Sequence, residues 1–146
     1  MGRKRLLTSF RIDALPLVNT YIQNSGLADL FDQCVPSGPG MKLSHSTILL
    51  FLLRNIMVSG FPLYKLSDWA RNYIPELLGL SAASLRFLND DRIGRSLDQL
   101  FLADRSSLCT RIALEIVRRY HIQMKSLHND STTVSFSGNY SVKQKF

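Results

Sequence analysis

The sequence is poor in cysteine, in acidic residues and in long apolar runs, and each shortage excludes a class of protein. The two cysteines, Cys34 and Cys109, lie far apart and outside any Cys-x-x-Cys spacing, so neither a disulfide framework nor a zinc site is predicted. None of the three histidines has another histidine or a cysteine at metal-ligand spacing. The cysteines are therefore expected to be buried, reduced thiols in a reducing cytoplasm.

No apolar run is long enough to cross a bilayer. The longest one, residues 48–53, continues only to Val58 after the polar pair Arg54 and Asn55, whereas a membrane span needs about 20 residues. The basic residues 1–5 are followed by only two leucines, so the apolar segment of an export signal is missing. The sequence therefore predicts a cytoplasmic protein without a membrane partner.

Acidic residues are outnumbered, because 11 Asp and Glu stand against 18 Lys and Arg and give a net charge of +7. Such a charge favours a polyanionic partner through counterion release but carries no sequence specificity, and a solvated basic surface is the alternative. With 146 residues, of which 45% are hydrophobic, the chain can bury one core without disulfides. Glycine-rich phosphate loops and Ser-His-Asp patterns are missing, so nucleotide binding and serine hydrolysis are not indicated.

Apolar residues recur at helical spacing over most of the chain. Asp13 is the candidate N-cap of a first helix that ends at Gly26, and a short second helix follows over residues 27–34. Ser44 can cap a third helix, residues 45–59, which is apolar nearly all round. This pattern predicts a mainly α protein, a multi-helix bundle with the third helix at its centre.

A further helix is expected to begin at Pro62, with Leu63, Leu66 and either Trp69 or Ala70 facing the core. The tryptophan could instead stack on a nucleic-acid base, but its helical spacing with Leu66 favours a place in the core.

Asn89 or Asp90 can accept N–H bonds at the start of the next helix. The adjacent acids Asp90 and Asp91 could form a metal site, but capping is the simpler account. Arg95 is spaced to pair with acids on the exposed side of this helix, Asp91 and Asp98. Its apolar residues form an i, i+4, i+7, i+8 stripe that should be buried: Ile93, Leu97, Leu100 and Phe101.

Asp104 is the expected cap of a last long helix with a basic outer face. Arg111 and Arg118 lie two turns apart on one side, which makes this helix a candidate for phosphate contact. A basic arm, residues 1–12, could also follow a phosphate backbone. A solvated helix face and a solvated tail are the alternatives. The candidate DNA-binding residues are Arg3, Lys4, Arg5, Arg111, Arg118 and Arg119.

The chain changes character near Gln123, where helical spacing gives way to alternation. Val134 and Phe136 lie on one side of an alternating segment, hydroxyl residues lie on the other, and a Gly-Asn pair ends it. We therefore expect a short C-terminal β-strand or hairpin. Asp130 in this segment must be solvated, hydrogen-bonded, paired or metal-bound. Its plainest role is to accept backbone N–H bonds at a strand end.

Two segments resemble insertion-sequence transposases of the DDE type. The stretch Leu-His-Asn-Asp-Ser-Thr-Thr, residues 127–133, resembles the first catalytic strand of their RNase H-like domain, which supplies the first of three metal-binding carboxylates. Residues 87–98, Phe-Leu-Asn-Asp-Asp-Arg-Ile-Gly-Arg-Ser-Leu-Asp, resemble the Leu-Asn-Asp-Asp-x-(Leu/Ile)-Gly-Arg-x-Leu-Asp signature that these proteins carry upstream. The relevant branch has an N-terminal helical region that is classified only as a domain of unknown function.

The resemblance implies three parts: a basic arm at residues 1–12, a helical domain at 13–122 and the start of an RNase H-like domain at 123–146. It gives Asp130 the role of a catalytic metal ligand, with Mg²⁺ as the cofactor of the complete enzyme. The chain stops at Phe146, so the other two carboxylates have no counterpart in it. We therefore expect a truncated catalytic domain that is inactive alone and does not hold Mg²⁺ tightly.

Two functions are expected on this basis. The first is that of an N-terminal transposase fragment that takes part in transposition by binding the terminal inverted repeats of its element, in the bacterial cytoplasm with the nucleoid. The alternative is an all-helical interaction module without DNA binding. Such a module would pair with a second copy or with a full-length transposase, as an oligomerisation or inhibitory unit.

Overall fold

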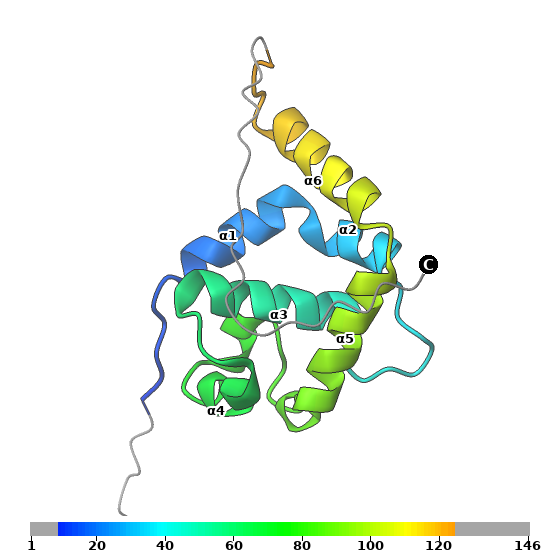
Figure 1. The fold of residues 1–146 in the computed structure, drawn as a ribbon. Helices are drawn as coiled ribbons and strands as arrows, with labels where there is room; N and C mark the ends of the chain where they lie inside the picture. Colours follow the sequence, from blue (N-terminus) through cyan, green and yellow to red (C-terminus); the bar gives the residue numbers. More distant parts are fainter. Residues whose placement is uncertain (1–8, 125–146) are drawn as a thin grey trace, which may run out of the picture.

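The computed structural model describes residues 9–124, and this part of the chain is mainly helical. Six α-helices follow one another: α1 Leu15–Ser25, α2 Leu27–Cys34, α3 His45–Val58, α4 Leu66–Ala70, α5 Asp90–Leu102 and α6 Arg105–Arg119 (Figure 1). Short 3-10 turns connect them: η1 Leu63–Lys65, η2 Pro75–Leu78 and η3 Leu85–Phe87. The prediction of a mainly α, multi-helix fold is confirmed, whereas the predicted C-terminal strand or hairpin lies outside the described residues.

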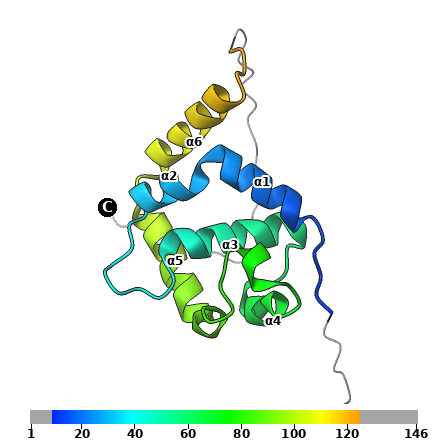
Figure 2. The ribbon, with the colours of Figure 1, turned by 180° about the vertical axis from the view of Figure 1, so that it is seen from behind.

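Helix α3 lies at the centre, as its all-round apolar sequence predicts. The side chain of Ser44 accepts a hydrogen bond from the Thr47 N–H (3.1 Å), so the helix begins where the sequence places it. Ile48 and Phe51 are fully buried. Helices α1, α2 and α5 all pack against α3, and both views of the ribbon show it enclosed between α1 and α2 on one side and α4 on the other (Figures 1 and 2).

An aromatic group joins α3 to the α4 region. The ring of Phe51 meets Trp69 edge-on at 5.6 Å between centroids, and Trp69 lies 4.9 Å from Tyr73. Such aromatic pairs stabilise a core beyond the area that they bury. Trp69 is only 2% exposed, so its predicted place in the core is confirmed.

Asp13 does not cap α1, contrary to the sequence-based expectation. Its carboxylate instead accepts a hydrogen bond from the Tyr73 hydroxyl (2.5 Å) and pairs with Arg11 (2.9 Å). The N-cap position falls to Ala14, which offers no side-chain bond. The tyrosine hydrogen bond lowers the pKa of Asp13. A partner 60 residues away therefore prevails over the local cap.

Two predicted apolar faces are only partly buried. On α5, Ile93 is buried, but Leu97 is exposed and Phe101 is 66% exposed, because α5 meets α3 along a narrower strip than the stripe spans. Leu63 is also exposed, since residues 63–65 form a 3-10 turn that does not continue the buried face of α4. The prediction of buried thiols is wrong for Cys109, which is exposed, while Cys34 is half-buried.

To cross a bilayer, a helix must be both long enough and apolar enough. Between residues 9 and 124, no single helix meets both requirements. Helix α3 and the segment Leu63–Ala70 meet them only when taken together, and they are bent by 104° relative to each other.

A glycine pair offers a test of this backbone geometry. Gly79 has a φ of +73°, and a Cβ there would lie 2.9 Å from the Arg54 guanidinium. Gly94, inside α5, has no atom within 4 Å of such a Cβ. We expect Gly79→Ala to destabilise the fold by about 1–2 kcal/mol, and Gly94→Ala to stabilise it by about 0.5–1 kcal/mol. Urea unfolding measures the free energy of unfolding of both variants. An equal change in the two would contradict the geometry.

Candidate nucleic-acid interface

Helix α6 carries the arginines that the sequence singles out for phosphate contact. Asp104 caps it as predicted, because its carboxylate accepts hydrogen bonds from the Ser107 N–H (3.1 Å) and from the Ser107 hydroxyl (2.6 Å). Leu108 is the only residue of α6 that is fully buried. Helices α1 and α2 lie between α6 and α3 in both ribbon views (Figures 1 and 2). The helix is therefore an outer layer of the fold.

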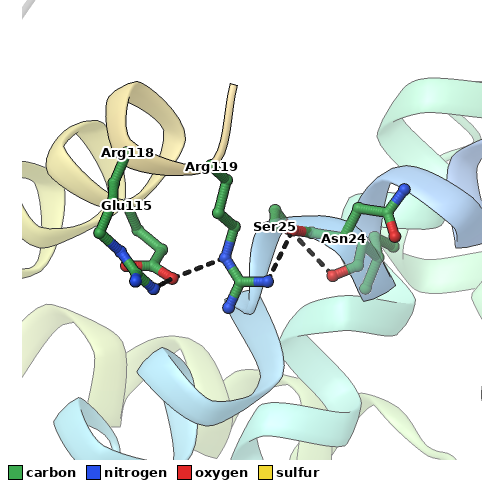
Figure 3. A network of polar contacts seen from close by, with 6 residues as sticks. Asn24, Ser25, Glu115, Arg118 and Arg119 are labelled. Atoms are coloured by element: carbon green, nitrogen blue, oxygen red, sulfur yellow. Dashed lines mark hydrogen bonds and ion pairs between the residues drawn. The ribbon is translucent and has the colours of Figure 1, made fainter. Parts of the chain in front are cut away.

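Arg119 attaches the end of α6 to α1. One terminal nitrogen of its guanidinium donates to the carbonyl of Asn24 (2.9 Å), and Nε donates to Glu115 (2.6 Å), as Figure 3 shows. The guanidinium also lies over Gly26, where a Cβ would come within 2.6 Å of it. Arg119 thereby satisfies a carbonyl at the C-terminal end of α1, which the helix itself leaves unpaired.

Arg118 binds the same carboxylate from the solvent side. It donates to both oxygens of Glu115, at 2.6 Å and 3.1 Å, while its side chain stays 73% exposed (Figure 3). The hydrogen bonds from Arg118 and Arg119 lower the pKa of Glu115 to about 2. Glu115 thus neutralises part of the positive charge that α6 offers to a polyanion.

Arg111 faces α2. Its guanidinium donates to the Gln33 side chain and to the sulfur of Cys34, the latter at 3.2 Å. The structure therefore does not present Arg111 and Arg118 as one outward pair. The side chain of Arg118 is 73% exposed, against 36% for Arg119. The other predicted DNA contacts, Arg3, Lys4 and Arg5, lie outside the described residues, as does Asp130.

A second group of cations lines a recess of about 490 Å³ between the loop of residues 39–42, His45 at the start of α3, and α5 as far as Gln99. We call it the basic recess. Its cations are Lys42, Arg92 and Arg95. The sequence-based reasoning missed it, because it paired Arg95 with Asp91 and Asp98. Within residues 9–124 neither ion pair forms.

A buried polar pair braces the recess. His45 Nδ1 lies 3.0 Å from the hydroxyl oxygen of Ser96, and that hydroxyl donates to the carbonyl of Arg92 (3.0 Å). Since the serine gives its one proton to that carbonyl, His45 Nδ1 is the donor in its bond to the Ser96 oxygen. Ser96 is 0% exposed. The pair fixes the first residue of α3 against the middle of α5.

The acids of the Asn-Asp-Asp stretch do not build a metal centre in the described part of the chain. Asn89 caps α5, because its side-chain oxygen accepts the Arg92 N–H (2.9 Å), which confirms the capping account. Asp90 and Asp91 occupy the first turn, where the helix dipole favours negative charge. Across residues 9–124, no three His, Cys, Asp or Glu side chains come close enough to hold a metal ion together.

Comparison with known proteins gives one family. The model of a domain of unknown function, DUF4277, matches residues 7–114. This range contains all of the basic recess and Arg111, and it ends just before Glu115. No curated protein and no solved structure matches the chain significantly.

The lowered pKa of Glu115 predicts that its contribution to the stability of the fold is lost in acid. A carboxyl with a lower pKa in the folded protein stabilises the fold while it is ionised, so its contribution is complete above about pH 4.5 and is lost as the pH falls toward 2. The stability difference between the wild type and Glu115→Gln should therefore shrink over this interval. Thermal unfolding at several pH values measures it, with Glu76→Gln, an exposed glutamate, as control. A pH-independent difference would contradict the assignment.

Proposed function

Because the chain belongs to the DUF4277 family of domains of unknown function, we propose a role that suits both its helical fold and its two transposase-like segments. Residues 13–122 are the DNA-binding helical domain of a DDE-type insertion-sequence transposase. The observation that carries the proposal is the position of the signature at residues 87–98. Its two arginines, Arg92 and Arg95, line the basic recess, and neither forms an ion pair with an acid among the described residues.

The net charge of +7 supports a polyanionic ligand. Lys and Arg side chains that neutralise phosphates release condensed counterions, which makes the affinity fall as salt rises. The DNA target under this proposal is the terminal inverted repeat of the element. Contacts to phosphate fix the position of a protein on DNA, whereas the described helices supply no evident set of base-reading side chains.

Asp130 has the catalytic part of the proposal. Under the proposal Asp130 would be the first of three carboxylates that hold Mg²⁺ in a complete enzyme, and the metal would supply Lewis-acid chemistry for phosphodiester cleavage. One carboxylate does not hold a pair of such ions. The proposal therefore assigns DNA binding to the helical domain and expects no cleavage by residues 1–146 alone.

The alternative function is a protein-interaction module without DNA binding. The observation that favours it is the set of exposed apolar side chains on α5 and α6: Leu97, Phe101, Leu102 and Leu114. Its partner would be a second copy of the chain or a full-length transposase. A salt-insensitive dimer with no affinity for DNA would favour this alternative.

DNA binding is tested with Arg118, whose side chain is 73% exposed and bonds only within α6 among the described residues. Arg118→Ala should weaken binding to a duplex of the element's ends and reduce the slope of log affinity against log salt by about 1, because one phosphate contact is lost. The matched control is Arg71→Ala, which removes another exposed arginine from a surface ion pair on the opposite part of the fold. Fluorescence anisotropy at several salt concentrations gives both slopes. An absence of duplex binding by the wild type would reject the DNA-binding proposal.

Catalysis is tested separately. We expect the purified chain to leave supercoiled DNA that carries the element's ends intact, with Mg²⁺ or Mn²⁺ present. Gel electrophoresis detects nicking, and Asp130→Asn provides the control for a contaminating nuclease. Metal-dependent nicking that disappears in Asp130→Asn would overturn the expectation that Asp130, without two further carboxylates, does not support cleavage.

A further inference from the structure

We propose that the basic recess binds a phosphate group. Lys42 reaches it from the loop before α3, and Arg92 and Arg95 reach it from the first turns of α5. The chemistry is that of a phosphate ester, from a nucleic-acid strand or from a smaller phosphorylated ligand. That the phosphate belongs to a nucleic acid rests on the function proposed above. The proposal that the recess binds phosphate does not depend on that function.

The first argument is the state of the three cations. Every other Lys or Arg side chain between residues 9 and 124 has a partner within the fold. Some donate to oxygen or sulfur, as Arg54, Arg111 and Arg119 do, and others lie over an aromatic ring, as Arg86 and Arg105 do. Lys42, Arg92 and Arg95 make no such contact with a described residue, and all three line one recess. Three like charges outnumber the single acid of the lining, Asp91, and repel one another, so the arrangement favours an anion.

The second argument is Arg92. Its Nε is shielded from solvent and has no hydrogen-bond partner among the described residues. A buried donor without an acceptor costs free energy, because it has lost its bonds to water. The flat guanidinium presents its donors as a fork that matches two oxygens of a phosphate. A phosphate in the recess would give this guanidinium the anionic partner that it lacks among the described residues.

The third argument is the rigidity of the walls. The bond between His45 and Ser96 ties the two walls together from a fully buried position, so the separation between the loop side and the α5 side is set before any ligand arrives. A preformed site loses less conformational entropy on binding. The remaining polar groups, Asn89 and Gln99, offer amide N–H donors, and the one acid in the lining, Asp91, leaves the three cations in excess.

The test uses the 146-residue chain and two probes, inorganic phosphate and a DNA duplex of the element's ends. The key variants are Arg92→Gln with Arg95→Gln, and Lys42→Gln alone. The lysine lies on an exposed loop and makes no contact that the fold needs, so it covers the case in which the double variant fails to fold. Arg86→Gln is the control, because it removes one positive charge from a nearby arginine outside the recess.

We expect inorganic phosphate to shift the NMR resonances of the recess, and the double variant to weaken its affinity about tenfold or more, since charge-assisted hydrogen bonds are lost. Lys42→Gln should weaken it in the same direction, and Arg86→Gln should not. If duplex DNA competes with phosphate, the ligand is a nucleic-acid phosphate.

The other outcomes separate the two proposals. If phosphate binds in the recess but DNA neither binds nor competes, the site takes a smaller phosphorylated ligand, so the site stands and the DNA-binding function fails. If DNA binds equally well to the wild type, the double variant and Lys42→Gln, and phosphate shifts no recess resonance, the site is overturned while DNA binding stands.

Discussion

The burial of α3 is the constraint on which the rest of the described structure depends. Its middle is apolar on every side, so the chain must place other helices around it to remove that surface from water. A polar bond at each end then fixes which helix lies where. His45 at the start meets Ser96 of α5 (3.0 Å), and Arg54 near the end donates to Asn19 of α1 (2.7 Å). Apolar area supplies the driving force, and these two bonds supply the orientation.

Helix α6 is attached on a different principle. Where α3 is held by hydrophobic contact on several sides, α6 is held mainly by guanidinium groups that reach carbonyl, amide and thiol groups of α1 and α2. Arginines that look available to DNA in the sequence are thus partly committed to the fold. The cations without a partner among the described residues line the recess instead, Arg92 and Arg95 on α5 and Lys42 on the loop before α3. The basic character of the chain is consequently divided between a structural role on α6 and a ligand-binding role that we assign to the recess.

Local signals in the sequence predicted the fold well, and distant contacts limited the rest. Ser44 correctly predicted the start of α3, because an N-cap hydrogen bond joins residues only three positions apart. Asp13 looked like an equal cap and was not one, since Tyr73 reaches it from 60 residues away. The recess was not predicted for the same reason, because it depends on contacts between distant residues. Lys42 and Arg95 line one recess only after α3 and α5 pack together. Helical periodicity tells which residues share a face, but not whether another element covers it.

The chain has a single tryptophan, and Trp69 lies in the aromatic group where α3 meets the α4 region. Its indole N–H has no acceptor among the described residues and is shielded from water, so the excited state meets an apolar environment. The tryptophan emission, excited at wavelengths that the five tyrosines do not absorb, therefore comes from one point in the core. A red shift of that emission would report the opening of the α3 core directly, in any variant and without a label.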